Sequence, residues 1–318
     1  MDTSSIAHKG RLLPVLVVLL AGCASLPPDV RRLPDDAETV ELVDTPFHPQ
    51  HRFQCGPAAL LTALEASGVS VPLQTLVDKV YLPARQGSMR SEMLAATRTS
   101  GRVAYPIEGT LAALHAELEA GRPVVVLQNL GVAAFPRWHY AVVVGIDAHG
   151  DSVVLRSGTD RRRVTDIDTF LRTWRRSNYW GFVSLRPNES PARPERQRWF
   201  EAIAALEQAG QPAAAATAWT AVLDVWPRNT TALFGLANAL FAGGDPERAV
   251  RVYRRLLVHD VDLLPARNNL ALALSELGRI EDALHEIDLA IARAGESGLS
   301  AELSHTRALI LARRASAE

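Results

Sequence analysis

Residues 54–64 read QCGPAALLTAL, a polar start followed by an almost continuous apolar run. The run predicts a buried helix over 57–67, ended by Gly68. Pro57 falls in its first turn, where the missing N–H of proline costs nothing. Cys55 therefore lies at the start of a helix. There, unpaired N–H groups and the helix dipole stabilise a thiolate and lower the thiol pKa, so the pattern predicts a usable nucleophile at neutral pH.

The segments that follow change from helical to strand-like patterns. Helical stretches come first, short β-branched stretches come next, and one more helix and strand close the unit. The predicted helices cover 72–81, 91–100, 110–120 and 166–176, and the predicted strands cover 123–130, 139–146, 152–157 and 179–185. Helices followed by an antiparallel sheet predict an α+β domain over residues 45–186.

His139 is the histidine best placed to act with this thiol. It opens the apolar strand HYAVVVGI, directly after the loop GVAAFPRW. A thiol nucleophile for acyl transfer needs a base and an oxyanion donor. An imidazole at a strand end beside a cysteine at a helix start is the arrangement of papain-like folds. A half-buried strand histidine without chemistry is the alternative, and the setting of Cys55 favours the catalytic role.

Two motifs carry a family resemblance. PQHRFQCGPAALLTAL at 49–64 and HYAVVVGID at 139–147 resemble the papain-like cysteine peptidases that remove double-glycine leaders from bacteriocins, and their stand-alone relatives. The resemblance covers about residues 45–185. It implies that Cys55 is the nucleophile, that His139 is the general base and that Gln50 donates to the oxyanion. Gln54, next to the nucleophile, is the other glutamine, with a helix-capping or surface role as its alternative.

The third catalytic position departs from that family. The family has an Asp, usually followed by Pro, near the end of the strand after the histidine strand, and here the place is held by Ser157 and Gly158. A serine hydroxyl can orient the imidazole but cannot stabilise an imidazolium as a carboxylate does. Asp160 can substitute if its loop folds back, and Asn129 is a third candidate. Ser157 is the positional match.

The C-terminal part has a different character. Residues 187–196, PNESPARPER, form a Pro-rich break, and the chain beyond them is rich in Ala and Leu. Small residues recur there at a spacing of 34, as Gly210, Gly244 and Gly278 do. This period resembles tetratricopeptide repeats, which implies an all-α domain over 197–318 that docks a protein partner. The stretch 302–315 is predicted to be its capping helix.

The N-terminus has the pattern of a secretory signal. Lys9 and Arg11 precede an apolar run that is too short to span a bilayer. The sequence Leu-Ala-Gly-Cys that ends at Cys23 resembles a bacterial lipoprotein signal. The resemblance implies removal of residues 1–22, a diacylglycerol on the Cys23 sulfur, a tether over 23–44 and an outer-membrane location facing the periplasm. An ordinary signal peptide, in which this cysteine has no role, is the alternative.

Composition excludes several other classes. A formal net charge of −1 gives no electrostatic case for nucleic acid as a partner. The two cysteines exclude a disulfide framework, and no CxxC, HExxH or glycine-rich phosphate loop supports a metal or a nucleotide cofactor. The basic run 161–163 is predicted to be a solvated face, with contact to an anionic lipid or peptide as its alternative.

Together these observations predict a lipid-anchored cysteine peptidase that hydrolyses a peptide bond in a periplasmic or extracellular peptide or protein, with its repeats docking substrate or partner. Two alternatives share the same residues. One is a non-catalytic scaffold that uses the peptidase fold as a peptide-binding groove, and the missing Asp motivates it. The other is an amide transferase or deamidase, because an acyl-enzyme can be resolved by acceptors other than water.

Overall fold

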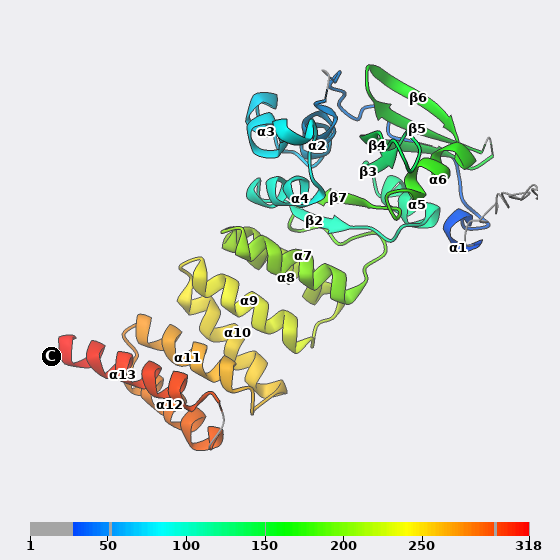
Figure 1. Cartoon of the computed structure of the whole chain (residues 1–318). Helices are drawn as coiled ribbons and strands as arrows, with labels where there is room; N and C mark the ends of the chain where they lie inside the picture. Colours follow the sequence, from blue (N-terminus) through cyan, green and yellow to red (C-terminus); the bar gives the residue numbers. More distant parts are fainter. Residues whose placement is uncertain (1–27, 51–52, 150, 296–297, 318) are drawn as a thin grey trace, which may run out of the picture.

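The computed structural model describes residues 28–50, 53–149, 151–295 and 298–317, which form a helix-and-sheet domain followed by an array of helices (Figure 1). Cys23 and the predicted signal lie outside the described residues. Within the described ranges, no helix is both long and apolar enough to cross a membrane.

A seven-stranded antiparallel sheet forms the centre of the first domain. Its order is β2-β7-β3-β4-β5-β6, and β1 pairs with β4 beside this path. The strands are β1 (Val40–Glu41), β2 (Val103–Pro106), β3 (Val124–Asn129), β4 (Trp138–Asp147), β5 (Ser152–Ser157), β6 (Asp160–Asp166) and β7 (Gly181–Leu185). The four predicted strands are confirmed as β3, β4, β5 and β7.

Helices cover both faces of this sheet, because its central strands are apolar on both sides. In β3, Val124 and Val126 belong to one core cluster, whereas Val125 and Leu127 belong to the other. The first cluster packs under α5 (Leu111–Glu119) and α6 (Ile167–Arg175), and the second packs under α2 (Cys55–Ala66), α3 (Leu73–Val80) and α4 (Arg90–Thr99). The predicted α+β fold with its N-terminal helices is confirmed.

One strand next to the site has no counterpart in the sequence prediction. β6 forms a hairpin with β5, and its sequence, DRRRVTD, lies between the predicted strand 152–157 and the predicted helix 166–176. The strand is exposed along most of its length because it is the edge of the sheet, so it lacks the apolar alternation that marks a buried strand. Of the basic run, Arg162 pairs with Glu41 at 2.8 Å, and all three arginines are exposed.

The segment predicted to be a tether packs on the domain from residue 28 onward. It contains α1 (Pro28–Arg31), whose Val30 is buried, and strand β1, which pairs with β4. The carbonyl of Glu38 bonds to Nε2 of His115 at 2.7 Å. These contacts place 28–44 with the first domain, whereas the sequence of this segment shows only prolines and mixed charge.

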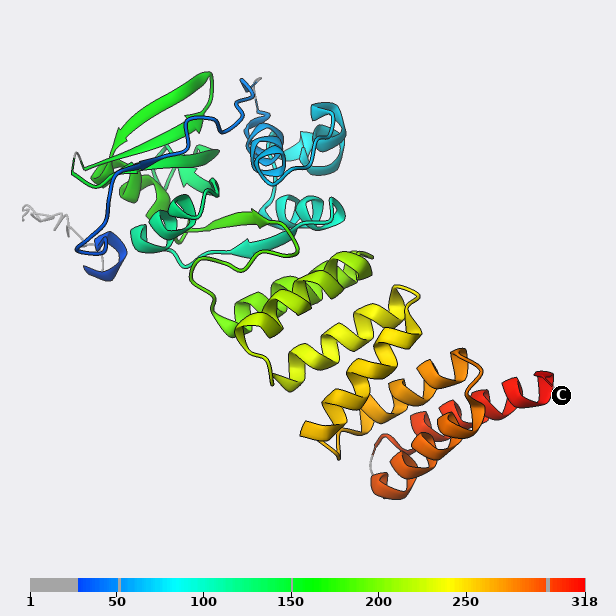
Figure 2. The same ribbon diagram turned by 180° about the vertical axis from the view of Figure 1, so that it is seen from behind.

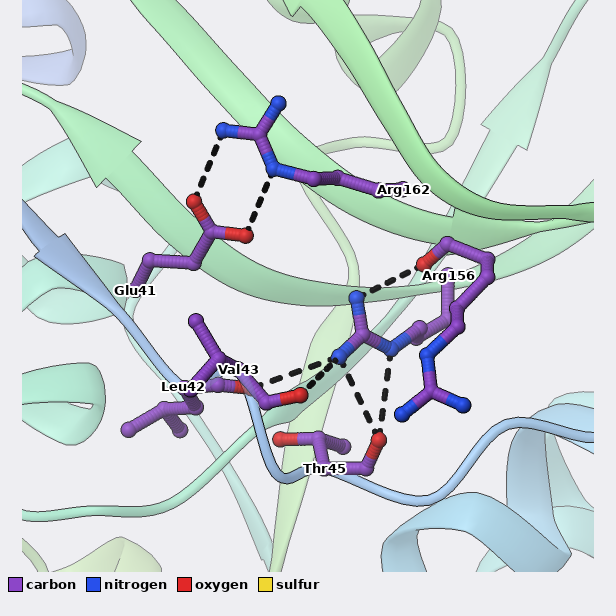
Figure 3. A network of polar contacts seen from close by, with 7 residues as sticks. Glu41, Leu42, Val43, Thr45, Arg156 and Arg162 are labelled. Carbon is purple, nitrogen blue, oxygen red and sulfur yellow. Dashed lines mark hydrogen bonds and ion pairs between the residues drawn. The ribbon is translucent and has the colours of Figure 1, made fainter.

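Arg156 fixes the chain that leads from β1 toward Cys55. Its buried guanidinium donates hydrogen bonds to the carbonyls of Leu42, Val43 and Thr45, with distances between 2.9 and 3.4 Å (Figure 3). A further bond of 2.6 Å reaches the carbonyl of Arg161. Since Arg156 precedes Ser157 on β5, one side chain joins the β5–β6 hairpin to the approach to the nucleophile.

Antiparallel helix pairs make up the second part of the chain. They are α7 (Arg196–Gln208), α8 (Pro212–Val225), α9 (Thr230–Ala242), α10 (Pro246–His259), α11 (Leu264–Glu276) and α12 (Ile280–Ala294), followed by α13 (Ser300–Ala317). Gly210, Gly244 and Gly278 lie in the turn within each pair, with φ between 73° and 79°. This left-handed conformation favours glycine and explains the 34-residue spacing. The stretch 302–315, predicted to be a capping helix, lies within α13, which packs on α12.

The two parts share a packed interface. The hydroxyl of Tyr105 on β2 donates to the carbonyl of Arg193 and accepts from the N–H of Glu195, both at 3.2 Å. Glu195 then caps α7, and Trp199 of that helix is fully buried. Helix α7 lies along β2, the edge strand, and the later helices extend away from it (Figure 2). The C-terminal end of the Pro-rich segment 187–196 is therefore held against the first domain.

Candidate active site

A cavity of about 940 Å³ brings three of the predicted site residues together. Its lining includes Cys55 at the start of α2, His139 at the start of β4 and Gln50. Residues 85–90, the end of the connection from α3 and the first residue of α4, form a second wall of the cavity. A cavity of this size is large enough for several residues of a peptide.

The sulfur of Cys55 lies among backbone N–H groups. The N–H groups of Tyr140, of Gly56 and of Cys55 itself donate to it, and they favour the thiolate. Burial acts in the opposite direction and outweighs them, so the pKa of the Cys55 thiol is raised above its usual value. The sequence prediction of a lowered thiol pKa is thus wrong, because the helix start is visible in sequence but the walls that bury the sulfur are not.

His139 bonds to Ser157 rather than to a carboxylate. Its Nε2 lies 2.8 Å from the Ser157 hydroxyl, and Ser157 is buried at the end of β5. Burial, together with the charges of Arg163 and Arg137, lowers the pKa of His139 to about 4. The ring is therefore neutral at pH 7. No hydrogen bond joins Cys55 to His139 in the described part of the chain, so the resting pair is a thiol and a neutral imidazole.

The backbone of Gln50 is held next to the end of β5. Its backbone N–H donates to the carbonyl of Gly158 at 3.1 Å, and Gly158 directly follows Ser157. Gln54 lies outside the cavity lining and holds the N-cap position of α2, where its side chain makes no capping bond. Of the two glutamines, Gln50 is the one that the fold brings beside Cys55 and His139.

Two family models match parts of the chain. Residues 42–181 match the model of the Peptidase_C39 like family, and residues 200–262 and 244–298 match that of the tetratricopeptide repeat. The chain carries a C39-like peptidase domain. Tetratricopeptide repeats follow it.

Solved structures of both kinds are similar to parts of the chain. A putative C39-like peptidase from Bacillus anthracis has 17% identity and a TM-score of 0.38, covering 46% of this chain and 98% of its own. The type III secretion translocator chaperone SycD of Yersinia enterocolitica has 18% identity and a TM-score of 0.35, covering 37% and 84%. The Sgt2 repeat domain of Aspergillus fumigatus has 22% identity and a TM-score of 0.36, covering 39% and 82%. No curated protein sequence matches significantly.

The two other candidates for the third position of the C39-like domain have different surroundings. The Oδ1 atom of Asn129 accepts from the N–H groups of Gly131 at 2.9 Å and Arg137 at 2.8 Å, and so it fixes the loop before β4. Asp160 pairs in register with Ser157 across the hairpin but is exposed, and it is absent from the cavity lining. Only Ser157 among the three bonds to His139.

A close contact explains the glycine after the nucleophile. A Cβ atom on Gly56 would lie 2.3 Å from Oγ of Ser88 and 2.6 Å from its Cβ, closer than real Cβ atoms approach. Glycine therefore lets residues 85–90 lie directly against the start of α2. The carbonyl of Ser88 also accepts a bond of 3.3 Å from the hydroxyl of Tyr140 on β4. These contacts join the two walls of the C39-like site.

Sequence reasoning missed most of this second wall. Arg85, Met89 and Arg90 carry no motif, and they reach the cavity only because α3 and α4 pack beside α2. The loop GVAAFPRW, directly before His139, contributes Arg137 and Trp138 to the lining. Among the described residues, no cluster of His, Cys, Asp and Glu is arranged to hold a metal ion.

Proposed function

We propose that the chain is a cysteine peptidase in which Cys55 is the nucleophile and His139 the general base. The observation that carries the proposal is that Cys55, His139 and Gln50 line one cavity, with the Ser157 hydroxyl 2.8 Å from Nε2 of His139. The other ring nitrogen, Nδ1, has no hydrogen-bond partner among the described residues, so it is available to take the thiol proton.

The proposed reaction follows from these positions. Nδ1 of His139 removes the proton as the Cys55 sulfur attacks the carbonyl carbon of the peptide bond. The Gln50 amide and the backbone N–H groups at the start of α2 donate to the oxyanion. The imidazolium then protonates the leaving amine, and water, activated by the same ring, hydrolyses the thioester and restores the thiol. Ser157 orients the ring throughout.

A second function is favoured by one specific feature of the site. Among the described residues no carboxylate faces His139, and the pKa of the thiol is raised while that of the imidazole is lowered. Both directions oppose the thiolate–imidazolium pair of fast cysteine peptidases. A peptide-binding scaffold without catalysis needs no such pair, and it is therefore the alternative to test.

Hydrolysis by purified variants tests the choice. Wild type, Cys55→Ala and His139→Ala are incubated with denatured casein, and new N-termini are counted by mass spectrometry. His149→Ala is the matched control, since His149 is exposed in the turn after β4. The peptidase proposal expects cleavage by wild type and His149→Ala only, with similar melting temperatures for all four proteins. Equal cleavage by Cys55→Ala would refute Cys55 as the nucleophile, and no cleavage by any of the proteins would favour the scaffold.

Location and partner form a further part of the proposal. A lipid on Cys23 would hold the chain at the outer membrane facing the periplasm, and the repeats would dock a protein substrate or partner. The charged-then-apolar signal pattern and the cysteine after it support the anchor. Labelling cells with radioactive palmitate should mark wild type and leave Cys23→Ala unlabelled; equal labelling would refute the lipid site.

A further inference from the structure

The cavity beside Cys55 is strongly one-sided in charge. Its lining contains Arg85 and Arg90 from the second wall and Arg137 from the loop before β4, and none of the described residues that line it is acidic. The start of α2 adds the partial positive charge of a helix N-terminus between these walls. A charged cleft with one sign on both sides concentrates ligands of the opposite sign.

Two of these arginines have no side-chain partner among the residues that the structure describes. Elsewhere in the fold arginines pair with carboxylates, as Arg122 does with Glu117 at 2.6 Å and Arg162 does with Glu41 at 2.8 Å. In the described part of the chain, the exposed side chains of Arg85 and Arg137 make no ion pair or hydrogen bond. Their donors are therefore free for a bound molecule.

The third arginine is held in place. The Arg90 guanidinium donates to the carbonyl of Ser177 at 2.8 Å and lies 5.6 Å from the centre of the Trp180 ring. It therefore contributes a fixed charge to the wall. Apolar side chains, Phe53, Met89 and Trp138, also line the cavity and are partly exposed.

The geometry points to a substrate that carries a carboxylate next to the scissile bond, bound between Arg137 and Arg85, with an apolar side chain against Trp138 and Met89. This inference rests on the proposed peptidase function and names its substrate class. The carboxylate belongs either to an acidic side chain or to the C-terminus of a peptide.

Such a substrate would supply the charge that the site lacks. The charged groups that face His139 are Arg137 from the loop before β4 and Arg163 from β6, while β5 offers only the neutral Ser157. Asp160, at the hairpin end, is exposed to solvent. A substrate carboxylate on Arg137 offsets the repulsion between that arginine and the imidazolium formed during reaction, so binding would favour proton transfer from Cys55.

A competition between two alkylating reagents tests the charge of the cavity. The full chain is treated with equal iodoacetate and iodoacetamide, which differ by a carboxylate and an amide, and mass spectrometry of the Cys55 peptide gives the product ratio. The same chain unfolded in urea is the reference. We expect folded Cys55 to favour iodoacetate at least about threefold over the reference at low salt. A ratio equal to the reference would overturn the inference.

Variants identify the arginines responsible. Arg137→Gln and Arg85→Gln should each lower the ratio by about two- to fivefold, the range for an exposed ion pair. Arg251→Gln, at an exposed arginine of α10, is the matched control and should leave the ratio unchanged. Equal ratios in all variants would also overturn the inference.

Peptide protection separates the two sources of carboxylate. Cys55 is alkylated by iodoacetamide in the presence of Ac-Ala-Phe-Glu-Ala-amide or its Gln analogue, and of Ac-Ala-Phe-Ala as free acid or amide. Protection by the Glu peptide alone assigns an acidic side chain, whereas protection by the free acid alone assigns a C-terminus. Protection by neither acid would refute a peptide carboxylate.

These readings stay independent of the peptidase proposal. The absolute alkylation rate and its dependence on His139 report whether Cys55 is an activated nucleophile. The reagent ratio reports only the cavity charge, and it can be measured at pH 9, where an ordinary thiol also reacts. Absence of Cys55-dependent casein cleavage together with a high ratio would refute the peptidase but keep the carboxylate site, whereas Cys55-dependent cleavage with the reference ratio would do the reverse.

Discussion

Replacing Ser157 by aspartate should convert the resting site into an ion pair. The Ser157 hydroxyl lies 2.8 Å from Nε2 of His139, so a carboxylate built at this position reaches the same ring nitrogen. Burial and the positive charges of Arg163 and Arg137 hold the pKa of the His139 imidazole at about 4. An added carboxylate opposes both effects because it stabilises the protonated ring.

The size of the effect follows from the pKa of His139. A carboxylate at hydrogen-bond distance raises a neighbouring pKa by about 1–3 units. Each pKa unit gained by His139 multiplies the population of the thiolate–imidazolium pair by about ten. The reason is that the equilibrium constant for proton transfer from Cys55 to His139 depends on the difference between their two pKa values. The Ser157→Asp variant should therefore alkylate Cys55 between about tenfold and a thousandfold faster than wild type at pH 6.

The assay is the rate of iodoacetamide reaction at Cys55 from pH 5 to pH 10. Wild type should react only as the pH approaches the raised pKa of the thiol, whereas Ser157→Asp should show a plateau near pH 6–7. Ser157→Asn is the matched control, with the same size and no charge. Asp160 opposes this position across the hairpin and adds some repulsion. Equal rates for Asp and Asn variants with unchanged melting temperatures would refute the reasoning.

Three other perturbations test the fold around the site. Between pH 7 and pH 5, wild type should lose about 2 kcal/mol more unfolding free energy than His139→Asn, because the unfolded ring protonates near 6.5 and the folded ring near 4. Stability falls as the pH falls, and urea titrations at the two pH values measure the loss. Equal losses in the two proteins would contradict the prediction. Gly56→Ala should cost about 1–3 kcal/mol in thermal melts because its Cβ meets Ser88, and adding Ser88→Gly should recover part of this loss. Arg156→Met should destabilise the chain by more than about 1.5 kcal/mol and speed proteolysis at residues 42–45, because the carbonyls of this segment lose their hydrogen-bond donor. Arg162→Met is the control, because it removes only an exposed ion pair.

The sequence predicted those elements whose local pattern matches their final surroundings. The apolar run after Cys55 forms α2, and the β-branched runs form the central strands. Gly210 and its equivalents recur because each turn needs the same left-handed residue. Ser157, chosen by position in its strand, does bond to His139, although its catalytic role stays a prediction.

Features that depend on distant packing were not predictable in this way. β1 is only two residues long, and β6 is a charged edge, so neither carries an apolar pattern. The raised pKa of Cys55 depends on burial by walls that come from separate parts of the chain. Arg85 reaches the site only through the packing of the helices on either side of it. The local sequence pattern predicts the start of α2, but it does not predict which distant residues bury Cys55 there.

The packing of α7 on β2 has a consequence for how a bound partner is presented. Trp199 is fully buried and Tyr105 holds the chain before α7, so the repeats are joined to the first domain by a core rather than by a hinge. A protein bound along the repeats would then lie at a fixed distance and in a fixed orientation relative to the cavity beside Cys55. The chain would then select a partner by distance. What decides cleavage would be the number of residues between the docking segment and the scissile bond, more than the sequence at that bond.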